Sequence, residues 1–66
     1  MKITLNGQDK TLNNGISLLE LLSELSLQPE TVVIELNTEI IQPDAYGEQK
    51  LNDADSVEII RFVGGG

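Results

Sequence analysis

Cysteine and histidine are both absent from this chain of 66 residues. Without cysteine, no disulfide can compensate for the small core of so short a chain, and no side-chain thiol can act as a nucleophile or zinc ligand. Without histidine, the chain lacks the commonest metal ligand and the commonest general base near pH 7. We therefore expect no metal site and no acid–base enzyme chemistry of the histidine-dependent kind.

Basic residues are scarce as well. Four lysines and arginines stand against eleven acidic residues, which gives a formal net charge of −7. Phosphate backbones are bound through basic side chains, and the four present are scattered along the sequence, at Lys2, Lys10, Lys50 and Arg61. The composition argues against a nucleic-acid partner and against an anionic membrane surface. The acidity either keeps a small domain soluble or steers it toward a basic groove on a partner, and composition does not choose between these roles.

Long apolar runs are missing too. No stretch approaches the length of a membrane span, and the segment Met1–Leu5 lacks the apolar region of a signal peptide. We expect a single soluble domain, cytoplasmic and monomeric.

What the sequence does contain is a clear order of elements, beginning with a hairpin. Residues 2–5 alternate polar and apolar, as a half-buried strand does. Asn6-Gly7 follows, a dipeptide typical of tight hairpin turns because both residues accept positive φ. Residues 8–12 are predicted to form the returning strand, and their polarity suggests the edge of a sheet.

A helix of about ten residues is predicted next. Ser17 stands at the N-cap position with Glu20 three residues later, which is the pattern of a capping box. Ile16 and Leu21 occupy the positions of a hydrophobic staple. The apolar stripe follows helical spacing, at Leu18, Leu21, Leu22 and Leu25. Pro29 ends the helix or the loop behind it.

The second half of the chain indicates three further strands. Residues 31–37 are β-branched and alternate, residues 39–42 form a short strand that stops at Pro43, and residues 56–63 form the last strand. Between them, residues 44–49 read as an irregular turn, and Lys50-Leu51 is expected to pair briefly before a loop at residues 52–55.

This order predicts an α+β fold of the β-grasp kind, a mixed sheet of four to five strands with one main helix packed across it. In such a fold the first and last strands lie side by side and parallel at the sheet centre, and the helix belongs to the crossover between them. We assign residues 1–63 to this domain and residues 64–66 to a flexible glycine tail.

No side-chain constellation suits an enzyme. Asp53 and Asp55 are close in sequence, but such residues usually form turns, and their spacing does not match a calcium loop. Ser17 has no activating base nearby, and its capping role accounts for it. Tyr46 is interpreted as an anchor of its loop rather than as a catalyst. No glycine-rich phosphate loop is present.

The chain end is the remaining candidate. Gly64-Gly65-Gly66 follows directly on the last predicted strand, and three extended residues reach on the order of 10 Å. Glycine lacks Cβ, so Gly64 and Gly65 can pass through a narrow opening and carry the carboxylate of Gly66 into another protein's active site. An ionised carboxylate is a poor electrophile, but its acyl adenylate can be attacked by a nucleophile. A tunnel that excludes water protects such an adenylate from hydrolysis.

A β-grasp body that ends in this tail resembles the small sulfur-carrier proteins related to ubiquitin, and among them the carrier of thiamine biosynthesis. The likeness covers the whole chain. Its supporting segments are Asn6-Gly7, Ser17–Leu22, Val33–Asn37, Glu39–Ile41 and Leu51–Ile60. One departure is Ala54, where the family commonly has glycine.

The resemblance implies a carrier that is a protein co-substrate and not itself an enzyme. An adenylyltransferase of the ubiquitin-activating type would adenylate the Gly66 carboxyl with ATP, and this chain would bind no cofactor of its own. A cysteine desulfurase system would then supply the sulfur for a thiocarboxylate, which thiazole synthase would use to form the thiazole ring. Two alternatives stay open: a molybdopterin-synthase-type carrier subunit, and a ubiquitin-like interaction module without covalent chemistry.

A docking surface is predicted from strand alternation. If Val32, Ile34 and Leu36 face the helix on one strand, and Val57 and Ile59 do so on the last strand, their neighbours point outward. Because these strands are adjacent in a β-grasp fold, Val33, Ile60 and Phe62 are expected to form one exposed apolar patch for partner binding. The alternative is that Phe62 packs against the edge of its own core.

Overall fold

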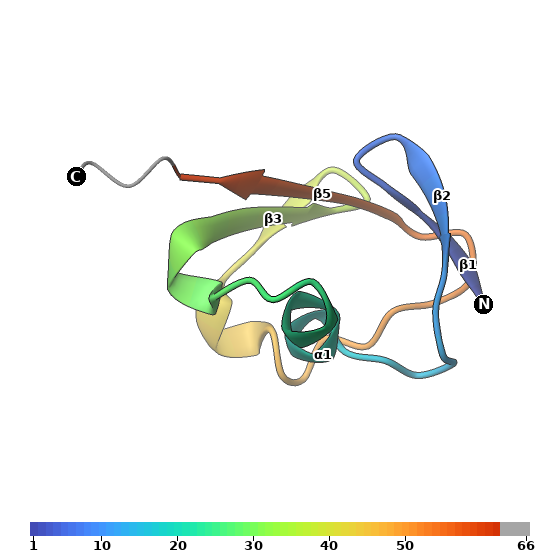
Figure 1. Ribbon diagram of the computed structural model, residues 1–66, viewed down its shortest axis with the longest axis horizontal. Helices are drawn as coiled ribbons and strands as arrows, with labels where there is room; N and C mark the ends of the chain where they lie inside the picture. Colours follow the sequence, from blue (N-terminus) through green and yellow to red (C-terminus); the bar gives the residue numbers. More distant parts are fainter. Residues whose placement is uncertain (63–66) are drawn as a thin grey trace.

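The computed structural model describes residues 1–62, and within that range five strands form one mixed sheet with the order β2-β1-β5-β3-β4. The strands are β1 (Lys2–Leu5), β2 (Gln8–Thr11), β3 (Val32–Leu36), β4 (Glu39–Ile41) and β5 (Ser56–Arg61). The helix α1 (Leu18–Glu24) covers one face of this sheet (Figure 1). This is the predicted β-grasp arrangement.

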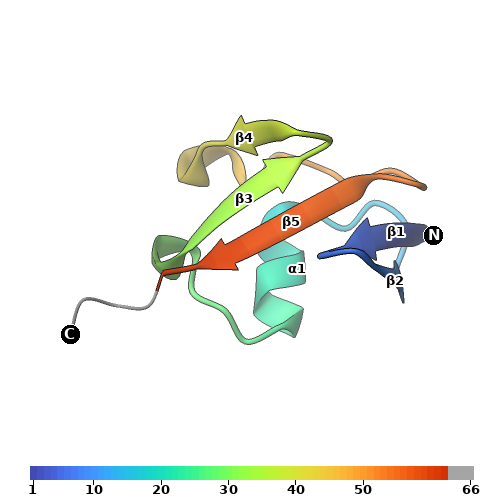
Figure 2. The same cartoon turned by 90° about the horizontal axis from the view of Figure 1, so that it is seen from above.

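The predicted parallel pairing of the first and last strands is confirmed. β5 pairs with β1 in parallel, with Thr4 opposite Ser56 and Leu5 opposite Val57. Its other edge pairs antiparallel with β3 over five positions, from Val32–Arg61 to Leu36–Val57. Seen from above, β5 runs through the middle of the sheet, with α1 behind it (Figure 2).

The core fills the space between α1 and the sheet, and it uses the predicted faces. Leu18, Leu21 and Leu22 of the helix are fully buried, as are Ile34 and Val57 of the sheet. Tyr46 is also buried, in agreement with its interpretation as a loop anchor, and burial raises the pKa of its phenol. The predicted brief pairing near residue 50 is present as a single bridge from Lys50 to Ser17.

The predicted capping box at the start of α1 is confirmed. The Glu20 backbone N–H donates to the Ser17 hydroxyl (3.1 Å), and the Ser17 N–H donates to the Glu20 carboxylate (2.9 Å). Hydrogen bonding of the exposed Glu20 carboxyl to Ser17, first of all to its backbone N–H, holds the pKa of that carboxyl below its ordinary value. The box therefore satisfies two backbone donors that the helix itself cannot satisfy.

Helix α1 is shorter than predicted, with seven residues instead of about ten. Ser26 takes a φ of 59°, and the N–H groups of Ser26 and Leu27 donate to the carbonyls of Ser23 and Leu22. This is a Schellman end, which usually has glycine at the left-handed position. Serine there gave no signal in the sequence, and Pro29 starts a separate short helix, η1 (Pro29–Thr31).

Two other boundaries differ from the prediction. Part of the segment expected to be irregular is a 3₁₀ helix, η2 (Pro43–Ala45), with proline at its first position. β5 ends at Arg61, whereas the predicted strand continued to residue 63. Phe62 is not part of the strand, but its N–H still donates a hydrogen bond to the Thr31 carbonyl. The predicted domain boundary after Val63 lies outside the described residues.

The loop before β5 contains a strained residue. Ala54 has a φ of 72°, a left-handed conformation that disfavours residues with a Cβ. Its N–H donates to the carbonyl of Lys2 (2.8 Å), so the loop is tied to β1 in this conformation. Glycine at this position would adopt the same conformation without a steric penalty.

We therefore expect Ala54→Gly to stabilise the protein by about 0.5–1 kcal/mol, because relief of the left-handed strain outweighs the added freedom of the unfolded chain. Thermal unfolding should show a rise of a few degrees in Tm. The matched control is Ala45→Gly, at the only other alanine. Ala45 is not among the positive-φ residues, so glycine there should lower Tm. Equal shifts in both variants would contradict the strain at Ala54.

Candidate functional site

The last strand leads directly toward the chain end, and the structure holds it firmly on both edges. On the β3 side, the hydrogen bonding continues beyond the strand, because the Phe62 N–H donates to the Thr31 carbonyl (2.8 Å). On the β1 side, regular pairing covers only two positions. The chain is thus anchored to within four residues of its terminus.

Asn6 extends the short parallel pairing with its side chain. Its backbone N–H donates to the Val57 carbonyl (2.9 Å), and its side-chain amide then both accepts from the Ile59 N–H (2.8 Å) and donates to the Ile59 carbonyl (3.3 Å). Asn6 itself has a φ of 49° in the predicted tight turn with Gly7. The amide therefore takes the place of a backbone group where β1 has already turned away from β5.

The predicted tail residues, Gly64, Gly65 and Gly66, lie outside the part of the chain that the structure describes. What can be placed is the position from which they continue. β5 ends on the side of the molecule remote from Met1, and no helix of residues 1–62 lies on the face of the sheet opposite α1 (Figures 1 and 2). We call this face the outer face.

The structure places two residues of the predicted apolar patch opposite each other on the outer face, and the third, Phe62, just beyond the end of β5. Val33 and Ile60 lie directly opposite each other on β3 and β5, and Phe62 follows two positions after Ile60. Ile60 is 50% exposed and Phe62 is 53% exposed, so Phe62 does not close over the core. The predicted inward faces are also correct, because Val32, Ile34, Val57 and Ile59 are buried.

Ile40 of β4 belongs near this patch and was missed by the sequence reasoning. The Ile40 side chain is 61% exposed. Its Cα lies opposite Glu35, which is two positions after Val33 along β3 and on the same face of the sheet. A hollow of about 200 Å³ is lined by Val33, Ile40 and Phe62 together with buried Val32 and Tyr46, so it is not confined to the outer face. Two consecutive isoleucines in a three-residue strand gave no alternation from which the outward one could be identified.

The outer face changes character away from the chain end. Glu35 and Glu58 are opposite each other on β3 and β5, two positions farther from the tail than the pair Val33–Ile60. Like charges directly opposite each other in a sheet are destabilising. In residues 1–62 the structure contains a single ion pair, Lys2–Asp9 (3.8 Å), so no basic side chain of this range lies within 4 Å of either carboxylate.

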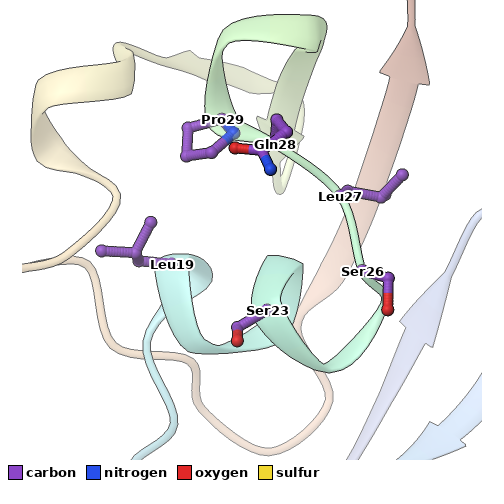
Figure 3. Close-up of a pocket in the computed structure, with 6 residues that line it drawn as sticks. All are labelled: Leu19, Ser23, Ser26, Leu27, Gln28 and Pro29. Atoms are coloured by element: carbon purple, nitrogen blue, oxygen red, sulfur yellow. The ribbon is translucent and has the colours of Figure 1, made fainter.

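Other surfaces of the described range offer little for catalysis. A hollow of about 470 Å³ lies between α1 and the loop that follows it, and its lining residues carry no charged group (Figure 3). They are Leu19, Ser23, Ser26, Leu27, Gln28 and Pro29. No group of three acidic side chains in the described range is arranged as metal ligands. Asp53 and Asp55 instead accept backbone hydrogen bonds from Lys2 (2.8 Å) and Asn52 (2.7 Å), as turn-forming residues do.

No helix in the described part of the chain is both long and apolar enough to cross a membrane.

Comparison with known proteins gives a consistent result. The sequence profile of the ThiS family matches residues 3–66. The sulfur carrier protein ThiS of Bacillus subtilis is 40% identical over 65 residues, which cover 97% of this chain and 98% of that protein. A crystal structure of the thiamine biosynthesis protein ThiS from Geobacter metallireducens superimposes with a TM-score of 0.85 at 38% identity, and the match covers both chains completely.

A second kind of relative is much longer. The thiazole synthase of Paramagnetospirillum magneticum is 35% identical over 66 residues, which cover all of this chain but only 20% of that protein. This chain thus spans about a fifth of the length of that relative. A sequence similar to the whole chain therefore occurs within a larger protein that is named for thiazole synthesis.

Proposed function

The chain belongs to the ThiS family of sulfur carriers in thiamine biosynthesis, and from this membership we propose that the Gly66 carboxyl carries the sulfur as a thiocarboxylate. The observation that supports this most directly is the 40% identity to the Bacillus subtilis carrier over almost the entire length of both chains. The carrier is not a catalyst, so the chemistry at its terminus is performed by partner enzymes.

The proposed cycle begins with activation. An adenylyltransferase joins the Gly66 carboxylate to the α-phosphate of ATP and releases pyrophosphate. A persulfide sulfur, supplied through a cysteine desulfurase, then attacks the carbonyl and displaces AMP, and cleavage of the remaining S–S bond by a thiol leaves the thiocarboxylate. Thiazole synthase takes up this sulfur in the thiazole phosphate ring. We place these reactions in the cytoplasm.

In this proposal Gly64 and Gly65 allow the Gly66 carboxyl to reach the active sites of the partner enzymes. A tunnel narrow enough to keep water from the adenylate leaves no room for side chains, and glycine has none. The body contributes a fixed starting point for the tail, because β5 is hydrogen-bonded to strands on both edges. ATP is consumed by the activating enzyme, and this chain has no role in holding it.

Deletion of Gly66 should abolish sulfur loading. The protein is incubated with its adenylyltransferase, ATP and a sulfur source, and its intact mass is measured. The unmodified chain should gain the mass that replacement of one oxygen by sulfur produces, while the deletion variant and a C-terminally tagged variant should gain none. Gly65→Val should block the adenylation step while leaving the fold intact. If the deletion variant gained as much sulfur as the unaltered chain, Gly66 would not be the carrier of the sulfur. If the tagged variant kept all of the protein's function, a plain interaction module would be favoured.

The patch of Val33, Ile60 and Phe62 is proposed to bind these partners. Phe62→Ser removes a half-exposed aromatic side chain, so the loss of stability should stay within about 1 kcal/mol. Affinity for the adenylyltransferase or the synthase should fall about tenfold or more, because aromatic anchors dominate such interfaces. Binding and thermal unfolding are measured on the same sample. A large loss of Tm with unchanged affinity would show that Phe62 serves the core.

The thiamine branch can be tested against the molybdopterin branch, because carriers of both kinds are activated by the same chemistry and differ in their body surfaces. The thiocarboxylated protein should support thiazole phosphate formation with thiazole synthase. It should not efficiently convert precursor Z to molybdopterin. The two reactions are reconstituted side by side with one preparation of the carrier. Efficient molybdopterin formation without a thiazole product would move the protein to the other branch.

A further inference from the structure

The side chain of Asn6 continues a series of backbone hydrogen bonds between β1 and β5. The Thr4 N–H donates to the Asp55 carbonyl, and the Asn6 N–H donates to the Val57 carbonyl, each over 2.9 Å. The series advances by two residues on both strands, so its next acceptor is the Ile59 carbonyl. That carbonyl accepts from the Asn6 side-chain amide (3.3 Å), and the oxygen of the same amide accepts from the Ile59 N–H (2.8 Å).

The backbone of β1 is not placed to make these two bonds. The donor that the series requires is the N–H of Gln8, but Gln8 has crossed the tight turn and belongs to β2. The other neighbour, β3, does not replace it. Because the Phe62 N–H donates to the Thr31 carbonyl, the alternation of an antiparallel pair directs the Ile59 N–H and carbonyl away from β3. The Asn6 amide therefore satisfies both backbone groups of Ile59.

A second asparagine holds the opposite end of β5 in a similar way. Asn37 has a φ of 51°, close to the 49° of Asn6, and each of them begins a two-residue turn between neighbouring strands. The side-chain oxygen of Asn37 accepts from the Ser56 N–H (2.9 Å), and its amide donates to the Asp55 carboxylate (3.0 Å). Asn37 thus holds the first residue of β5, whereas Asn6 holds the end from which the chain continues toward its terminus.

We propose that Asn6 is a positioning residue for adenylation of the Gly66 carboxyl, because its amide fixes the direction in which β5 leads into the tail. This inference rests on the proposed function. A strand that is paired along one edge only can swing about that edge, and the attachment of Ile59 to Asn6 on the second edge prevents this motion. Reaction in a narrow site depends on such placement, since a displacement of about 1 Å can lower a rate by about 100-fold.

The effect of Asn6 is expected in kcat of adenylation rather than in KM for the carrier. Pairing between β3 and β5 keeps Val33 opposite Ile60 without any contribution from Asn6. Contacts of the body with the adenylyltransferase are therefore retained in the bound complex. Only those bound complexes in which the tail points into the active site react, so a loss of direction lowers the rate of the bound state.

The test compares Asn6→Gly with Asn37→Gly as its matched control. Glycine accepts the left-handed φ at both positions, so neither turn is strained by the substitution. Each variant loses one side-chain amide and leaves one N–H of β5 without its partner, at Ile59 or at Ser56. Pyrophosphate release is measured with the cognate adenylyltransferase and ATP at varied carrier concentration. Thermal unfolding of both variants is measured in parallel.

Both variants should lose a similar few degrees in Tm, because they lose comparable hydrogen bonds. Asn6→Gly should lower kcat by about tenfold while KM changes less than about twofold, and the control should keep both constants within about twofold.

Hydrogen exchange measured by NMR provides a readout that does not depend on any enzyme. The Phe62 N–H is bonded to Thr31 and not to Asn6. Its exchange should nevertheless be faster in Asn6→Gly than in Asn37→Gly, because the whole end of β5 opens more often.

Equal losses of kcat in the two variants would overturn the inference, since Asn6 would then act through stability alone. Unchanged kcat in Asn6→Gly, or a rise in KM at unchanged kcat, would overturn it as well. Failure of the proposed function is distinguishable, because the unaltered chain would then release no pyrophosphate with the adenylyltransferase and gain no sulfur at Gly66. Exchange at Phe62 would still report whether Asn6 holds the end of β5.

Discussion

Pairing of β5 along both edges is the interaction on which the rest of this structure depends. The last strand of the chain lies between β1 and β3, so its position requires a parallel neighbour that is distant in sequence. A parallel pair needs a crossover, and α1 lies in the long connection between the two strands and covers the core. Regular pairing with β1 is limited to two positions, and the Asn6 amide continues it to Ile59. This arrangement anchors the chain as far as Phe62, whose N–H donates to the Thr31 carbonyl.

A second consequence follows from the size of the chain. In residues 1–62, one helix covers one face of the five-stranded sheet, and no described element covers the other face. The outer face therefore stays open, and its composition is free to serve recognition. Exposed Ile60 and Phe62 lie at the end of β5, and exposed Ile40 lies on β4 opposite Glu35, whereas the buried residues of the same strands face α1. In the proposed function the terminal carboxyl reacts, and the surface that selects the partner is a separate part of the body.

Sequence patterns were sufficient for the elements and their order, because the chain marks them with strong local signals. The capping box at Ser17 and Glu20, the turn at Asn6-Gly7 and the alternation in β3 all have direct counterparts in the structure. Other features carry no such signal. Ser26 and Ala54 have left-handed backbone conformations. Serine and alanine are not residue types from which such a conformation would be predicted. The opposition of Glu35 to Glu58 depends on strand register, which is known only once the strands are paired. The tail lies outside the described residues, so its role rests on sequence and family alone.

In the proposed cycle the carrier meets several enzymes in turn and has to leave each one, and the outer face is suited to this requirement. The apolar patch consists of three residues, far fewer than the roughly 20–30 residues that each partner contributes to a standard stable complex. Exposed carboxylates add mainly to the rate of association and to the choice of partner, because water and salt screen their attraction. In the proposed cycle, insertion of the tail supplies further contacts that last only while the terminus occupies an active site. Strong, permanent docking of the body would slow turnover, whereas a small apolar contact guided by charge permits both capture and release.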